Sequence, residues 1–322
     1  MGLVHSLSMS SQPSLPTLPS SSLSPAPRYS SLRSDGGALS FLTFTPSNSS
    51  TSLSYLNPSG FNAERVSQDF DVRCKVHEYG GACYFAVGAG RYVFSAVDAG
   101  GGEKCCLVEK GAVKDLCEGR FGCYVGGDDG FVYAVRERKV GSNETAAVLN
   151  EIVVLDLANG GAEVVVEGDD FYDSLEYDKE SKWLYYKHWN HPSMPWDEAN
   201  LSRMNLSSQS RDVEVLEEGV GVYDICLVDN VLTYLCEVGE EYKVVKLGDD
   251  GKREILAGQG AGWDVSTGSM GWRIGERNLA RGYGGVWCEW KEGEQGGEGE
   301  KLKIGAGGDG GGGDGDGDDP FA

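Results

Sequence analysis

The residues of this chain that are best suited to chemistry are concentrated in one stretch, YYKHWNHPSMPWDEANL, at positions 185–201. It contains two of the four histidines and two of the seven tryptophans. His188 and His191 are three residues apart and Asp197 follows six residues later, a spacing that on a helix would suggest metal ligands. However, the two prolines of the stretch exclude a continuous helix, and KWLYYKHW alternates as a strand does, so the two histidines face opposite sides. We therefore expect no metal and no other cofactor.

The same stretch allows two interpretations that involve no metal. In the structural one, Trp183 and Tyr185 fill the space between neighbouring sheets, and NHPSMPWDEAN forms a rigid loop in which Asp197 accepts hydrogen bonds. In the functional one, His191, Trp196 and Asp197 lie at a rim and contact a peptide or a protein partner.

A second candidate group lies in VHEYGGACYF, where His77 and Glu78 precede a pair of glycines. The glycines are typical of a bulge or a close backbone approach at the start of a strand. We expect Glu78 to pair with a nearby arginine such as Arg73 rather than to act as a base, and keep His77 and Glu78 as further candidates for peptide or partner contact. No catalytic residue is assigned, because neither a Gly-x-Ser-x-Gly nucleophile elbow nor a Ser, His, Asp spacing is found.

Composition narrows the classes of partner. The 322 residues include 28 basic and 50 acidic ones, a net charge of −22 that would repel nucleic-acid phosphates and anionic membranes. No apolar run approaches the roughly 20 residues that span a bilayer, so we expect neither nucleic acid nor membrane as a partner. Nine cysteines without a C-x-x-C pair indicate buried thiols in a reducing, cytoplasmic environment.

The two ends differ in composition from the rest. Residues 1–34 hold 12 Ser, 5 Pro and no acidic residue, which predicts a disordered tail, or alternatively a transit peptide to plastid or mitochondrion. Residues 305–322 are rich in Gly and Asp and predict an acidic, solvated, disordered tail.

Between these tails, residues 35–304 consist of short β-branched or aromatic segments separated by turns such as GGDDG, ANGG and GDDG, which predicts an all-β fold. Aromatic residues at five predicted strand starts recur at separations of 45, 48, 51 and 40 residues: Tyr79, Tyr124, Tyr172, Tyr223 and Trp263. Units of this length with four strands each are typical of β-propeller blades. We expect an incomplete β-propeller of about five four-stranded blades.

Several segments resemble a known family. DVRCKVHEYGGACYFAV, NEIVVLDL, DDFYDSLEYDKESKWLYYKHWNHPSMPWDEANL and the weaker GWDVSTGSMGWRIGER are similar, in this order, to the N-terminal propeller of prolyl oligopeptidase family serine peptidases, and most of all to the acylaminoacyl- and dipeptidyl-aminopeptidase-like branch. The resemblance covers roughly residues 60–290. It implies a propeller that precedes an α/β-hydrolase domain with a Ser, Asp, His triad and filters the access of peptides.

The hydrolase domain is expected to be missing here, and this leaves two hypotheses. The first is a non-catalytic or truncated propeller that binds a peptide or protein, including a hydrolase domain or chain, and gates access. The alternative is a part of a serine peptidase whose hydrolase domain is absent from this chain. Under either hypothesis we do not expect the chain to be active alone.

Overall fold

The computed structural model describes residues 26–35, 38–57, 62–67, 69–88, 90–141, 147–208, 211–238, 241–248, 250–258, 279–282, 285–289 and 301–305. All regular elements in these ranges are β-strands, and every paired set is antiparallel. The all-β prediction is confirmed. In the described part of the chain no helix is long and apolar enough to cross a membrane.

The strands form five sheets. The first comprises β1 (Arg28–Asp35), β2 (Ala38–Thr45), β3 (Ser50–Asn57) and β4 (Asn62–Arg65). The second comprises β5 (Asp71–Val72), β6 (Tyr84–Gly88), β7 (Arg91–Val97), β8 (Glu103–Glu109) and β9 (Ala112–Glu118). The third comprises β10 (Arg120–Gly126), β11 (Phe131–Val140), β12 (Ala147–Asp156) and β13 (Ala162–Val166).

The fourth sheet has seven strands: β14 (Phe171–Asp178), β15 (Trp183–Trp189), β16 (Ala199–Asn205), β17 (Val213–Val228), β18 (Val231–Glu237), β19 (Tyr242–Leu247) and β20 (Arg253–Gly258). The fifth comprises β21 (Leu279–Gly282), β22 (Gly285–Glu289) and β23 (Lys301–Gly305). In the fourth sheet the first half of β17 pairs with β16 and its second half with β18. The long strand therefore joins two four-stranded units.

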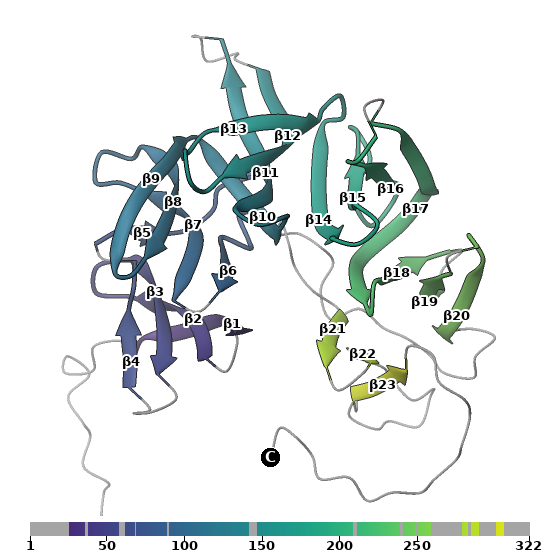
Figure 1. Cartoon of the computed structure of the whole chain (residues 1–322), viewed down its shortest axis with the longest axis horizontal. Helices are drawn as coiled ribbons and strands as arrows, with labels where there is room; N and C mark the ends of the chain where they lie inside the picture. Colours follow the sequence, from purple (N-terminus) through teal and green to yellow (C-terminus); the bar gives the residue numbers. More distant parts are fainter. Residues whose placement is uncertain are drawn as a thin grey trace, which may run out of the picture.

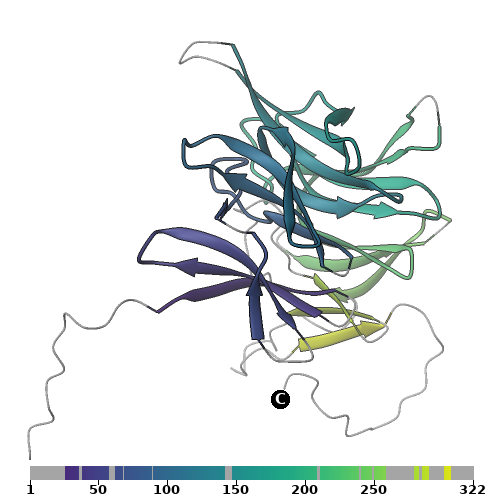
Figure 2. The same ribbon diagram turned by 60° about the vertical axis from the view of Figure 1, so that its left-hand side comes forward.

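The sheets stand side by side around a common centre (Figure 1). The inner strands of successive units contact one another, β6 with β10, β10 with β14, β14 with β17 and β17 with β21. Turned by 60°, the molecule shows the β1–β4 sheet and the β21–β23 sheet on the same side (Figure 2). Successive units thus present their first strands to the centre and their last strands to the outside.

The sequence of the inner and middle strands follows from this arrangement. In β7 six consecutive residues after Arg91 are buried, and all but Ser95 are apolar, as expected for a strand that is covered on both faces. In β14 seven consecutive residues after Phe171 are also buried, although four of them are polar or charged: Asp173, Ser174, Glu176 and Asp178. Each sheet therefore needs a neighbour on either side to bury its residues.

Tight turns connect the strands where the sequence supplies residues that tolerate positive φ. Lys110 and Gly111 have φ values of 52° and 79° between β8 and β9, and Asp229 and Asn230 have 49° and 63° between β17 and β18. Two successive residues with positive φ form the turn whose twist matches that of antiparallel strands. The predicted short strands with tight turns are therefore observed at these two positions.

Two boundary predictions need correction. Residues up to 34 were expected to be disordered, but Arg28–Asp35 forms β1 and pairs with β2, because its backbone hydrogen bonds and the contact of Tyr29 with Phe41 (ring centroids 5.8 Å apart) hold it on the sheet. Residues 1–25 and 306–322, which include most of both predicted tails, lie outside the described residues. Tyr79 does not start a strand: it lies in a turn and is 65% exposed, whereas β6 begins at Tyr84.

The other markers have different outcomes. Tyr124, Tyr172 and Tyr223 lie in β10, β14 and β17, the first strands of their units, as expected. Trp263 lies outside the described residues. Of the eight cysteines from Cys74 to Cys236, none forms a disulfide, and all are buried except the half-buried Cys117.

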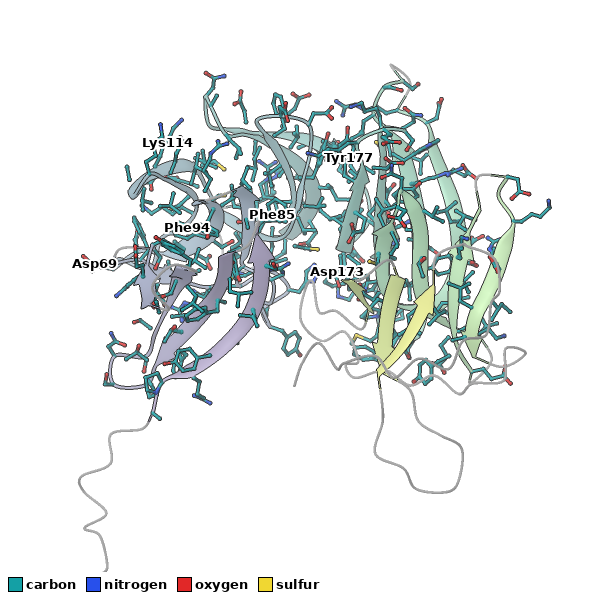
Figure 3. All side chains as sticks on the ribbon, turned by 60° about the horizontal axis from the view of Figure 1, so that its bottom comes forward. Asp69, Phe85, Phe94, Lys114, Asp173 and Tyr177 are labelled. Atoms are coloured by element: carbon teal, nitrogen blue, oxygen red, sulfur yellow. The ribbon has the colours of Figure 1, made fainter. Side chains whose placement is uncertain are left out.

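A buried ion pair lies at the inner side of the fourth sheet. The Lys187 ammonium is 3.1 Å from the Asp173 carboxylate, and their side chains are 1% and 3% exposed. The two residues are direct cross-strand partners in β14 and β15, and Asp173 lies near the middle of the molecule (Figure 3). Asp173 also accepts a hydrogen bond of 2.7 Å from the Ser174 N–H.

We predict that Asp173→Asn lowers the free energy of unfolding by about 3 kcal/mol, because it leaves the buried Lys187 ammonium without its counter-charge. The matched control is Glu254→Gln, which removes the acid of the exposed cross-strand pair Lys246–Glu254 (3.7 Å; Glu254 side chain 68% exposed) and should cost less than about 1 kcal/mol. Urea denaturation followed by circular dichroism measures both. Equal effects of the two substitutions would contradict the prediction.

Candidate functional site

The structure brings four of the five predicted site residues into one pocket. A cavity of about 410 Å³ is lined by His77, Glu78, His191 and Trp196, together with Tyr79, Glu137, Val148, Asn150, Phe171, Trp189, Ser193, Met194 and Pro195. It lies where β14 begins and β15 ends. The fifth predicted residue, Asp197, is exposed on the adjoining loop and does not line the pocket. We call this cavity the aromatic pocket.

The loop between β15 and β16 starts at a clamp formed by two acidic residues that precede β14. The Asp170 carboxylate accepts hydrogen bonds from the His191 backbone N–H (2.9 Å) and lies 3.0 Å from the His191 ring nitrogen Nδ1. Asn190 donates to the Asp169 carboxylate (2.6 Å) and accepts from the Asp170 N–H (2.7 Å). Hydrogen bonds from the His191 backbone N–H and, to a lesser extent, from the His191 ring lower the pKa of Asp170. The clamp fixes the position of His191 at the pocket.

The rest of this loop is held mainly by backbone hydrogen bonds. The Met194 carbonyl accepts from the N–H groups of Asp197 (2.9 Å) and Glu198 (3.2 Å). Trp196 packs half-buried against the core cluster that contains Tyr223, and its carbonyl lies over Gly221, where an added Cβ would approach it to 2.7 Å. This supports the predicted rigid loop. Within the described residues, however, no donor contacts the Asp197 carboxylate, so the expected hydrogen bonds to that group are absent there.

His77 and Glu78 lie in a tight turn that depends on a glycine. Both have positive φ (55° and 66°), as does Gly80 (69°), where an added Cβ would lie 2.2 Å from the Cys74 carbonyl oxygen. The close backbone approach predicted for the glycine pair is therefore present at Gly80. Positive φ at residues other than glycine is strained, and such a backbone persists only when surrounding contacts hold it in place.

A buried charge network holds the turn. The His77 N–H donates to the Glu137 carboxylate (2.8 Å) from a position 60 residues away in the chain. Glu137 in turn lies 2.5 Å from the Arg120 guanidinium, which also contacts Glu103 at 2.6 Å. Glu78 meets an arginine, as expected, but this is Arg120 at 4.0 Å and not Arg73, which pairs instead with Asp71 (2.9 Å). The turn thus brings Glu78 close to Arg120 at the start of β10.

Aromatic rings form the wall of the pocket. Phe171 and Trp189 stack with centroids 5.2 Å apart, and His77 meets both edge-on at 5.1 Å and 5.6 Å. His191 lies 4.7 Å from Phe171. Burial lowers the pKa of His77 to about 4, so its ring is neutral near pH 7. The pocket therefore combines the neutral His77 ring and the stacked pair Phe171–Trp189 with the exposed carboxylate of Glu78.

His188, the other histidine of the opening stretch, belongs to a different environment. Its Nε2 is 2.8 Å from the Ser202 hydroxyl and its Nδ1 is 2.8 Å from the Asp169 carboxylate. Burial lowers its pKa, against the opposing effect of Asp169. His188 and His191 thus contact different partners, and among the described residues no group of three or more His, Cys, Asp or Glu side chains could hold a metal ion.

A second cavity, of about 620 Å³, lies at the other ends of β10 and β14, where its lining includes Phe85, Tyr177 and Asp128 (the first two labelled in Figure 3). Two of its polar groups have partners within the chain: the Asp128 carboxylate is 2.7 Å from the Lys182 ammonium and accepts from the Tyr177 hydroxyl at 3.2 Å.

Sequence reasoning did not single out several residues of the aromatic pocket. Phe171, Trp189, Glu137 and Asn150 come from four different strands, and although three of them lie in the segments that resemble the peptidase propeller, none was assigned a binding role. The available signal was the presence of polar residues inside otherwise apolar strands, as with Asn150 at the head of NEIVVLDL. A buried polar residue needs a partner, which makes such a position informative.

The depressed pKa of His77 predicts a pH-dependent stability. The folded pKa of about 4 is below the ordinary value of 6.5, so between these pH values the unfolded chain binds a proton that the folded chain does not. The free-energy difference between wild type and His77→Gln should therefore shrink as the pH falls from 6.5 to 4, by up to roughly 1.4 kcal/mol per pH unit, and be constant above about pH 7.5. Urea titrations at a series of pH values measure this. A difference that stays constant throughout would mean that His77 is protonated as readily in the fold as in the unfolded chain.

Comparison of the sequence with protein-family models finds no match, and comparison with curated proteins finds none either. Solved structures do resemble the chain. A puromycin-hydrolyzing peptidase of Mycobacterium tuberculosis is 21% identical with a TM-score of 0.69, over 82% of this chain and 43% of that one. An acylaminoacyl peptidase of Pyrococcus horikoshii is 11% identical with a TM-score of 0.58, over 84% and 44%.

The fold is not restricted to peptidases, since an oligogalacturonate lyase in complex with manganese is 10% identical with a TM-score of 0.56, over 80% of this chain and 69% of that one. The chain spans less than half the length of the peptidases it resembles. At these identities the likeness establishes the fold alone: an all-β, propeller-like part of the kind present in those peptidases.

Proposed function

We propose that the chain is a β-propeller module that binds peptide or protein ligands at the aromatic pocket. Five four-stranded units support the blade assignment: β1–β4, β5–β9 with β5 and β6 together in the innermost position, β10–β13, β14–β17 and β17–β20. The β21–β23 sheet is part of a further blade. Face-to-face packing of such units around an axis is the principle of a propeller.

One observation carries the binding role. Residues from two separate turns, 77–79 and 191–196, meet residues of four strands in a single pocket whose wall is aromatic. Pockets that combine apolar walls with a few placed polar groups are the usual form of ligand sites. Peptides suit this chemistry because they offer apolar side chains together with backbone and terminal hydrogen-bonding groups, and the acidic pocket edge at Glu78 favours neutral or cationic ones.

The test is binding of fluorescein-labelled tetrapeptides of varied sequence, measured by fluorescence anisotropy. Met194→Glu places a charge at the pocket, at a side chain that is 44% exposed and so tolerant of substitution, and should weaken binding at least about tenfold. The matched control is Ile255→Glu, at a residue of β20 that is 45% exposed and does not line the pocket, and it should leave the affinity unchanged. Peptide binding that both variants retain would contradict the proposed site.

The alternative is that the chain is one part of a serine peptidase. The structural matches favour this alternative, because they cover 82–84% of this chain but only 43–44% of the peptidase chains. In this case the pocket would contact peptides on their way to a hydrolase domain or chain.

The alternative also predicts that this chain alone has no activated serine. Incubation of the folded chain with a fluorophosphonate should give no labelled serine, and chromogenic aminoacyl substrates should remain intact. Specific labelling of one serine would show that the chain contains a nucleophile of its own, and the assignment as a binding module would have to be abandoned.

A further inference from the structure

Two residues that line the aromatic pocket each have an enclosed side-chain atom without a hydrogen-bond partner among the described residues: Asn150 Oδ1 and His77 Nε2. Asn150 is 5% exposed. A buried acceptor that has no partner destabilises the fold, which is why such atoms are rare and need an explanation.

The chemical role of the Asn150 side chain is fixed by its other contact. Its amide nitrogen Nδ2 donates to the Asp170 backbone carbonyl at 2.7 Å. Since a carbonyl oxygen can only accept, the nitrogen must face Asp170, and the unpartnered atom is therefore the oxygen, a pure acceptor. Asp170 also accepts the hydrogen bond from the His191 N–H, so the same residue holds both Asn150 and His191.

The surroundings of this acceptor are apolar and aromatic. The stacked pair Phe171–Trp189 and the half-buried Trp196 line the same pocket, with Val148 and Met194 towards the solvent. Aromatic rings prefer other rings in offset-stacked or edge-on contact, a preference that His77 already satisfies against both members of the pair. A volume of about 410 Å³ is ample for one large side chain.

We infer that the aromatic pocket takes a tryptophan or tyrosine side chain of a peptide, whose indole N–H or phenol O–H donates to Asn150 Oδ1. This rests on the proposed peptide-binding function and adds the class of residue that is bound. An aromatic ring that carries a donor can both pack against the aromatic wall and donate a hydrogen bond to Asn150 Oδ1. Phenylalanine or leucine would pack against the wall but leave this acceptor buried without a partner. The Glu78 carboxylate, 84% exposed at the pocket, disfavours an anionic residue.

The experiment uses the full chain and four small probes: the N-acetyl amides of tryptophan, 1-methyltryptophan, tyrosine and phenylalanine. Ligand-observed saturation-transfer NMR titrations give the dissociation constants. Tryptophan should bind about 5- to 30-fold more tightly than 1-methyltryptophan, and tyrosine more tightly than phenylalanine by a similar factor, because only the first member of each pair offers a donor.

Two sets of variants locate the effect. Val148→Glu should abolish binding of all four probes, while Val213→Glu should not, because both valines are about half exposed (47% and 51%) but only Val148 lines the pocket. Asn150→Leu should reduce the preference for tryptophan over 1-methyltryptophan to about onefold. This ratio compares two ligands of the same protein, so a general loss of stability does not alter it.

The outcomes separate this inference from the proposed function. If all four probes bind equally and Val148→Glu abolishes binding, the pocket is a peptide site but the donor selectivity is wrong. If the preference for donors persists in Val148→Glu or in Asn150→Leu, the selectivity arises elsewhere and the inference is overturned. If none of the probes binds while the labelled tetrapeptides do, the inference fails and the proposed function stands. If neither class of ligand binds, both are overturned.

Discussion

The constraint on which this molecule depends is that its sheets are covered by neighbours on both faces. In β7 and β14 nearly every residue is buried, so no unit can be stable without a neighbour on each side. Packing sheet against sheet brings the inner strands β6, β10, β14 and β17 together in sequence around the centre. The same packing places a charge pair, Lys187 and Asp173, where a polar group is tolerated only because it has a partner.

The pocket is a direct consequence of this packing. Turns from different units end next to each other when their strands are stacked, and the charged residues between them hold them in place. Glu137 illustrates this, since it accepts from the His77 backbone and is itself held by Arg120. A positive-φ turn at His77 and Glu78 would be unstable in isolation, but these contacts and the Gly80 approach to Cys74 determine it.

The similarity to known structures defines what can be concluded from the fold. The same arrangement occurs in peptidases and in an oligogalacturonate lyase, so the architecture by itself does not select a chemistry. Function has to be argued from the site. Here the proposed peptide binding rests on the neutral imidazole of His77, the stacked pair Phe171–Trp189 and the acceptor on Asn150.

The sequence by itself determined the local structure: the all-β class, the strand of KWLYYKHW, the loop at NHPSMPWDEAN and the close approach at Gly80 all follow from side-chain alternation, prolines and glycines. It also identified His77, Glu78, His191 and Trp196, which do share a pocket. The tertiary structure alone decided that Glu78 faces Arg120 instead of Arg73, that residues from 28 onward join a sheet, and that Asn150 presents a free acceptor. The physical reason is that the pattern of apolar and polar residues determines the structure of neighbouring residues along the chain. Contacts between residues many positions apart depend instead on how the sheets pack against one another.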